Sequence, residues 1–117
     1  MSGFSISWLD LREGADHAAR DKPLARAALH FLDKPHGALL VDLGAGTGST
    51  LRALSALAPT LSAYIVWRLV DHDGALLDEA LRRHGTDCVI EDHQCDLRHV
   101  AELPLGGATL VSASALF

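Results

Sequence analysis

The fold of this chain is decided by residues 39–54, which read LLVDLGAGTGSTLRAL. Residues 39–43 form a short apolar run around one acid, a pattern typical of a buried strand. Farther on, Leu51, Leu54 and Leu57 recur at the spacing of one helix face. The alternating glycines between the two segments can adopt positive φ and carry no Cβ, so a ligand can approach the backbone N–H groups closely. The stretch therefore predicts a strand, a glycine loop and a helix that bind a nucleotide-like cofactor.

The composition indicates one globular domain. The 117 residues are 49% hydrophobic and 21% charged, with a formal net charge of −5. Lys and Arg do not cluster, which argues against a nucleic-acid partner. Without a signal peptide or a long apolar run, we expect no membrane contact and, by default, a cytoplasmic location. Cys88 and Cys95 match no familiar zinc spacing, so we expect no metal site.

The segment before the glycine loop is expected to be helical. Two pieces within residues 4–30 have apolar side chains near helical spacing, and Pro23 marks the break between them. In the second piece Leu24, Ala28, Phe31 and Leu32 share one side, which suits packing on a sheet. We therefore predict that residues 1–36 form an N-terminal helical segment that packs on the sheet of residues 37–117.

Strands and helices alternate through the rest of the chain. Residues 64–70 are rich in β-branched and aromatic side chains, which predicts a second strand. A helix follows and stops at Gly85, and a third, weaker strand begins at residues 88–90. Residues 108–117 predict a fourth strand. This alternation predicts parallel pairing through right-handed crossovers, hence a three-layer α/β/α fold with an open sheet covered on both faces.

No helix follows the fourth predicted strand. An apolar end strand leaves one sheet edge and part of one face bare, which natural domains usually cover. We therefore expect this chain to be the N-terminal portion of a longer protein, with its sheet truncated after the fourth strand. The alternatives are a compact domain, or a homodimer that pairs through the exposed fourth strand.

Three acids stand where successive predicted strands end, namely Asp42, Asp71 and Asp96. Ligands of open α/β sheets bind beyond the carboxyl ends of the strands, so these acids should face one cleft. An acid in the place of Asp71 can accept both hydroxyl hydrogens of a ribose, and Asp96 suits an exocyclic amine such as that of adenine. Each acid alone is more typical of a turn or a cap. Together with the glycine loop, they indicate a cofactor site.

The spacing of the glycines discriminates between cofactors. A dinucleotide fingerprint requires G-x-G-x-x-G, whereas here the third glycine is Gly48 and the fingerprint position is Ser49. No G-x-x-x-x-G-K-[ST] occurs, which excludes a nucleoside triphosphate loop of that type. A dinucleotide oxidoreductase is therefore a distant alternative.

Residues 41–48 resemble the acid-x-G-x-G-x-G first motif of the class I S-adenosylmethionine-dependent methyltransferases. Residues 69–73 and 94–97 are similar to the ribose-binding and adenine-binding motifs of that family, and residues 108–116 to its fourth strand. The resemblance covers about residues 37–117 and implies a Rossmann-like sheet. It also implies S-adenosylmethionine as cofactor, S-adenosylhomocysteine as product, and methyl transfer to an unidentified acceptor.

The same resemblance implies which residues form the cofactor site. Gly44, Ala45 and Gly46 would line the methionine part, and Asp71 would hold the ribose hydroxyls. His72 would lie beside the adenine, and Asp96 would accept from its amine, next to the Leu97 backbone. The full expected set is Asp42, Gly44, Ala45, Gly46, Gly48, Asp71, His72, Asp96, Leu97 and Ser112.

The residues that perform the transfer are not identified by the sequence. In the family, a motif at the end of the fourth strand often touches the methyl donor or acceptor; here that place is residues 112–115, which offer no strong general base. Transfer from a sulfonium gains chiefly from holding the nucleophile near and aligned, so a dedicated base is not required. We expect a small-molecule acceptor rather than a nucleic acid. A non-catalytic nucleotide-binding or dimerisation module of the same fold is the alternative.

Overall fold

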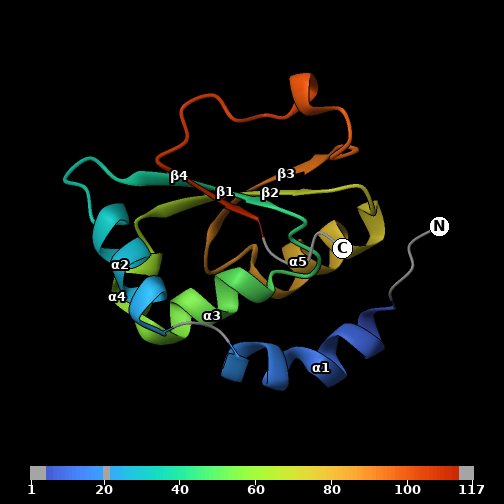
Figure 1. The fold of residues 1–117 in the computed structure, drawn as a ribbon, viewed down its shortest axis with the longest axis horizontal. Coiled ribbons are helices and arrows are strands. Elements are labelled where there is room, and N and C mark those ends of the chain that lie inside the picture. Colours follow the sequence, from blue (N-terminus) through green and yellow to red (C-terminus); the bar gives the residue numbers. More distant parts are fainter. Residues whose placement is uncertain (1–4, 20–21, 114–117) are drawn as a thin grey trace.

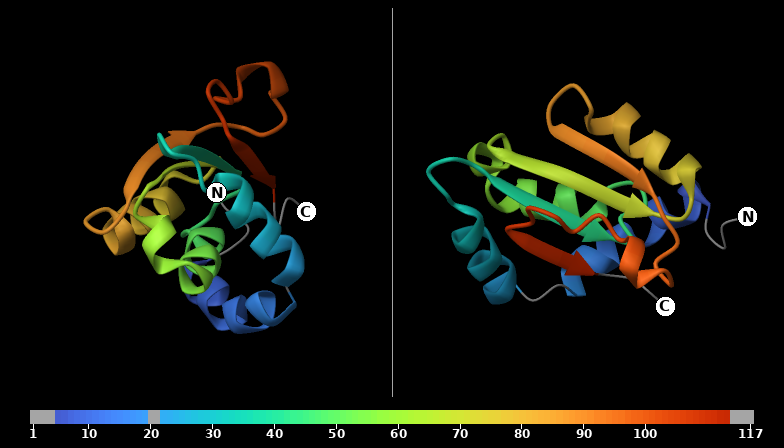
Figure 2. Two further views of the ribbon diagram at one scale, coloured as in Figure 1. Left: turned by 90° about the vertical axis from the view of Figure 1, so that its left-hand side faces the viewer. Right: turned by 90° about the horizontal axis from the view of Figure 1, so that it is seen from above.

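A four-stranded, all-parallel sheet forms the centre of the computed structural model, which describes residues 5–19 and 22–113. The strand order is β3-β2-β1-β4, so β3 and β4 form the two edges (Figure 2). The elements are α1 (Ile6–Ala19), α2 (Lys22–Leu32), β1 (Ala38–Leu43), α3 (Ser49–Leu57), α4 (Pro59–Ser62), β2 (Ile65–Asp71), α5 (Gly74–His84), β3 (Val89–Gln94), the 3₁₀ turn η1 (Val100–Glu102) and β4 (Leu110–Ala113). The predicted α/β fold with a parallel sheet is confirmed.

The core lies between the sheet and the helices. Leu40 of β1 is paired in register with Trp67 of β2, and both side chains are fully buried. Leu51 and Leu54 of α3 and Leu77 of α5 belong to the same buried cluster. The apolar periodicity of the two helices therefore serves to cover the two central strands.

The two faces of the sheet are covered differently. Helices α2, α3, α4 and α5 lie on one face, and the segment that joins β3 to β4, with η1, rises over the other (Figure 1, Figure 2). Arg68 holds this segment by donating to the backbone carbonyls of Pro104 and Gly106, both at 2.9 Å. In the described residues the second outer layer thus consists of an irregular segment with one short turn.

Helices α1 and α2 lie in different places. Helix α2 packs on β1 and β4. Helix α1 lies farther from the sheet, below α3 and α5 in Figure 1. Two ion pairs hold it there, Glu13 with Arg52 of α3 and Asp10 with Arg83 of α5.

Some boundaries differ from the expected ones. The third strand continues through polar residues to Gln94, and the short helix α4 lies between α3 and β2. The fourth strand begins at Leu110, two residues later than expected, and is described as far as Ala113; residues 114–117 of the predicted strand lie outside the described residues. No helix in the described ranges is both long and apolar enough to cross a membrane.

Candidate functional site

The glycine loop leaves the end of β1 and turns sharply into α3. Gly44, Gly46 and Gly48 all have positive φ, of 73°, 58° and 99°, a conformation that favours glycine over any residue with a Cβ. The N–H groups of Gly44 and Ala45 donate to the carbonyl of Val70, at 2.8 and 3.0 Å. These bonds hold the loop against the end of β2. The sequence predicts the ligand site at this loop.

Asp71 connects the end of β2 to the glycine loop. Its Oδ2 accepts from the Gly46 N–H at 2.8 Å, and its Oδ1 accepts from the Asp73 N–H at 3.0 Å. The residue is only 6% exposed. Each carboxylate oxygen has two acceptor positions, so both oxygens keep capacity for a ligand hydroxyl. Asp71, the expected ribose acceptor, therefore lies at the carboxyl end of β2 and bonds to the glycine loop.

Asp42 and Ser112 lie side by side on neighbouring strands. They are paired in the register of β1 and β4, two residues before the first glycine of the loop. The Asp42 side chain is completely buried, whereas Ser112 is half-buried. The structure thus brings these two predicted residues together at the base of the glycine loop.

Asp96 lies on the segment that follows β3. The Cys95 N–H donates to the Asp71 carbonyl at 3.0 Å, which brings this segment to the end of β2. The Asp96 carboxylate accepts from the side chain and the backbone N–H of Arg98, and these bonds hold its pKa well below its usual range. An adenine amine would share this acceptor with Arg98. Leu97, the neighbouring residue, is half-buried.

His72 follows Asp71 at the rim of the site. Its Nδ1 lies 3.4 Å from Oδ1 of Asp71, and its side chain is largely exposed. An exposed ring beside the β2 acid has room to lie against a flat ligand.

Arg52 fixes the rear of the glycine loop, a role that sequence reasoning did not identify. Its guanidinium donates to the Thr47 carbonyl at 2.8 Å and to the Thr47 hydroxyl at 2.9 Å. It also forms a bidentate pair with Glu13 of α1 and lies 2.9 Å from Nε2 of His84. One signal was available, because a cation near the start of a helix opposes the helix dipole and calls for compensating acceptors.

His84 is the neutral partner in this network. Burial lowers its pKa, and the nearby cations Arg52 and Arg83 lower it further. A neutral ring whose Nε2 accepts from Arg52 agrees with this direction.

Across the described residues, no group of three or more His, Cys, Asp or Glu side chains is placed to hold a metal ion.

Among solved structures, the chain is similar to the crystal structure of an RNA methyltransferase from Salinibacter ruber in complex with S-adenosyl-L-homocysteine. The two share 28% sequence identity with a TM-score of 0.51, over 80% of this chain and 58% of that one. This chain therefore spans less than two thirds of that protein. No protein-family model and no curated protein matches the sequence. The sheet order, the glycine loop and this similarity confirm the expected fold, and the chain has the Rossmann-like fold of the class I S-adenosylmethionine-dependent methyltransferases.

Proposed function

We propose that this chain binds S-adenosylmethionine and carries the cofactor-binding half of a methyltransferase. The observation that supports this most strongly is the bond between Asp71 and the Gly46 N–H. It joins the acid at the end of β2 to the glycine loop at the end of β1. An anionic acceptor and the backbone of the glycine loop thus meet at the carboxyl ends of the strands, where open α/β sheets bind ligands.

The residues present fit this cofactor. S-adenosylmethionine carries a positive sulfonium and a positive ammonium group, and the acids Asp42 and Asp71 lie beside the loop. The backbone of Gly46 is also accessible, because a Cβ at this position would meet only the Leu9 side chain, at 3.9 Å. A ligand can therefore approach the loop more closely than it could approach a residue with a side chain.

The proposed roles follow these positions. Gly44, Ala45 and Gly46 line the methionine part, and Gly48 closes the loop. Asp71 accepts from the ribose hydroxyls, and His72 lies against the adenine. Asp96 accepts from the adenine amine beside Leu97; its partner Arg98 is 87% exposed at the side chain and is free to turn into solvent. Asp42 and Ser112 form the floor near the methyl group.

The bound cofactor supplies a methyl group on a positively charged sulfur. The glycine loop and Asp71 would hold this group, so that an acceptor with a lone pair could take the methyl group and release its proton to solvent. The residues of this chain bind and orient the reactants, which is the main requirement of such an in-line displacement.

Calorimetric titration of the chain with S-adenosylhomocysteine tests this function. We expect saturable binding that NAD does not displace. The Asp71→Ala variant should bind more weakly by about 1.5–3 kcal/mol, as for a lost hydrogen bond to a charged group. Asp78→Ala, at an exposed acid of α5, is the matched control. A folded chain that gives no binding heat would overturn the proposal.

One observation favours a second function, a non-catalytic module that dimerises. In the described residues β4 pairs with β1 alone, and Val111 of β4 is 45% exposed. An unpaired strand edge is a template for pairing with a second copy. Sedimentation as a dimer, with cofactor binding but no transfer from labelled S-adenosylmethionine to any molecule of a cell extract, would support this function over catalysis.

A further inference from the structure

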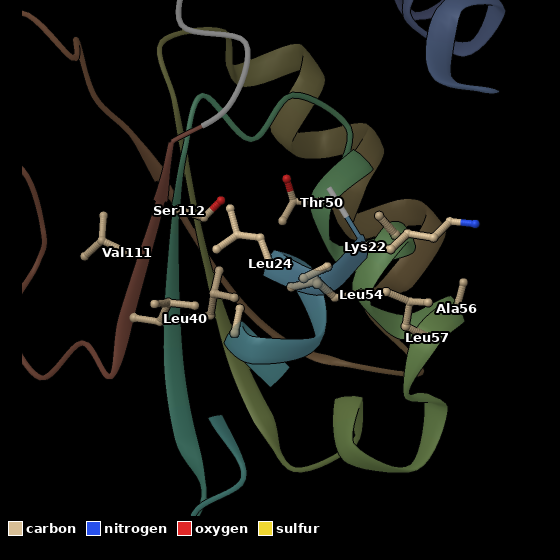
Figure 3. A pocket seen from close by; sticks show the side chains of 13 residues that line it. Lys22, Leu24, Leu40, Thr50, Leu54, Ala56, Leu57, Val111 and Ser112 are labelled. Atoms are coloured by element: carbon tan, nitrogen blue, oxygen red, sulfur yellow. The ribbon is translucent and has the colours of Figure 1, made fainter. Parts of the chain in front are cut away.

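A cavity of about 490 Å³ lies between α2, α3 and the strands β1 and β4 (Figure 3). Its walls are mostly apolar: α2 contributes Ala25 and Ala28, α3 contributes Ala53 and Leu54, and the sheet contributes Leu40 and Leu110. The small alanine side chains of both helices leave this space open. A volume of this size with few polar groups is characteristic of sites for small molecules.

The cavity is a half-open pocket between the helical layer and the sheet. Leu40, Thr50 and Leu54 line it and are each at most 6% exposed. Its open side is bordered by exposed residues of α2, α3 and β4: Leu24 is 68% and Val111 is 45% exposed, and Lys22 and Ala56 are also exposed. A ligand in the cavity would therefore lie between the helical layer and the sheet, with one side open to solvent.

The two hydroxyl groups that line the cavity, those of Thr50 and Ser112, lie toward one end. Figure 3 shows Thr50 and Ser112 near this end, on opposite walls, and Leu57 toward the other end. Thr50 is in the first turn of α3, directly after the glycine loop, and Ser112 is paired with Asp42 of β1. The polar end of the cavity thus adjoins the part of the cofactor site where the methyl group is expected.

We propose that this cavity holds the apolar body of a small-molecule methyl acceptor, with one hydroxyl or amine group at the end formed by Thr50 and Ser112. This inference rests on the proposed function. For a hydroxyl acceptor, an O–CH₃ bond forms as the C–S bond of the donor breaks, and the hydroxyl proton passes to water. The apolar walls select for the body of the acceptor, and the polar end orients its nucleophile.

The charges of the chain favour this acceptor over RNA. Among the described residues that line the cavity, only Lys22 is positively charged, and the chain has a formal net charge of −5. RNA binding requires several cations along the phosphate backbone and polar partners for the bases. Apolar walls offer neither.

The test uses 2-naphthol, an aromatic body with one hydroxyl, titrated into the full chain saturated with S-adenosylhomocysteine and observed by ligand NMR. We expect saturable binding to the wild type. Ala28→Phe, which fills the cavity from α2, should weaken it at least tenfold. Ala27→Phe places the same side chain at an exposed position of the same helix and should change nothing. Ala53→Leu fills the opposite wall and replaces Ala28→Phe if circular dichroism shows that variant unfolded.

Affinity for S-adenosylhomocysteine is measured for every variant and should stay at the wild-type value. If the chain binds S-adenosylhomocysteine but not 2-naphthol, or if the filling variants bind 2-naphthol as well as the wild type, the cavity proposal is overturned and the proposed function stands. A folded chain that does not bind S-adenosylhomocysteine overturns both. A short single-stranded RNA that binds the loaded chain in the absence of any 2-naphthol binding identifies RNA as the acceptor class instead.

Discussion

The Asp71 carboxylate accepts a hydrogen bond from the Gly46 N–H at 2.8 Å, across 25 positions of the sequence. Its second oxygen holds the Asp73 N–H just before α5 begins. One side chain thus sets the shape of the glycine loop and the start of the next helix. The acid proposed to bind the ribose therefore also organises the site before any ligand arrives.

Replacing Asp71 should therefore destabilise the chain even without ligand. Asp71→Asn keeps the shape of the side chain but turns one acceptor into a donor, which cannot pair with a backbone N–H. We expect the free energy of unfolding in urea to fall by about 1.5–3 kcal/mol, the range for a lost bond to a charged group. Asp78→Asn, at an exposed site, is the control. Equal stability of both variants would show that the Asp71 bonds do not hold the loop.

Arg52 should stabilise the loop and the docking of α1 together. Arg52→Ala removes the hydrogen bonds that the guanidinium donates to Thr47 and Glu13, whose acceptor atoms are partly buried. We expect a loss of about 1.5–3 kcal/mol in urea unfolding. Arg82→Ala is the control because Arg82 forms its ion pair at the surface, with a side chain that is 70% exposed, and it should change stability little. Similar losses for both would contradict the role of Arg52.

Stability should decline as the pH falls below the ordinary His pKa of 6.5. The folded state keeps His84 neutral because burial and two cations lower its pKa, whereas the unfolded chain protonates it near 6.5. The unfolded state then binds more protons, so the stabilisation is complete above pH 6.5 and is lost as the pH approaches the lower folded pKa.

Glu79 acts in a separate, more acidic range. Arg82 and Arg83 lower its pKa from 4.5 to about 2, so its contribution to stability is lost only as the pH falls below 4.5.

Urea unfolding across this pH range isolates the His84 contribution. In His84→Gln the amide oxygen can still accept from Arg52 but does not titrate, so the slope just below pH 6.5 should flatten. His99→Gln changes an exposed histidine and serves as the control, with a curve that should follow the wild type. A His84→Gln curve as steep as the wild-type curve would assign the slope to another group.

Gly48 should not tolerate alanine. Its φ of 99° is strained for any residue with a side chain, and a Cβ there would lie 3.4 Å from His84 and 3.5 Å from Arg52. We expect Gly48→Ala to lower the free energy of unfolding by about 1–2 kcal/mol, the cost of placing a residue with a side chain in the left-handed region, and so to lower the unfolding temperature. Gly106→Ala adds a Cβ with nothing within 4 Å and should be neutral or slightly stabilising. An unfolding temperature unchanged by Gly48→Ala would show that the loop relaxes around the new methyl group.

The sequence was sufficient for elements whose side-chain pattern and environment agree. The second strand was expected at residues 64–70 and lies at Ile65–Asp71, and Gly85 ends α5 as expected. The third strand was harder, because Glu91 and Asp92 do not look like a strand. They form one because the backbone pairs with β2 at a sheet edge, where side chains can stay exposed.

The site shows the same division. The glycine loop and the strand-end acids follow from local sequence, since each lies in or directly after the last residues of a strand that its neighbours predict. The contacts of Arg52 with Glu13 and His84 join residues 39 and 32 positions apart, and no local pattern specifies such pairs. The engagement of Asp96 by Arg98 is local, but a salt bridge and a ligand acceptor look identical in sequence.

The strand order also bears on how the chain folds. The strands β1, β2 and β3 follow one another in the sheet as in the sequence, whereas β4 pairs with β1 across all the intervening chain. Leu39 and Thr109, which bond where β4 begins, are 70 positions apart. Closing a longer loop costs more chain entropy before any contact repays it. We therefore expect β4 to join the sheet last and to detach first, with the earliest amide exchange of the four strands. The wall that carries Ser112 would then be the one that opens while the rest of the sheet stays folded.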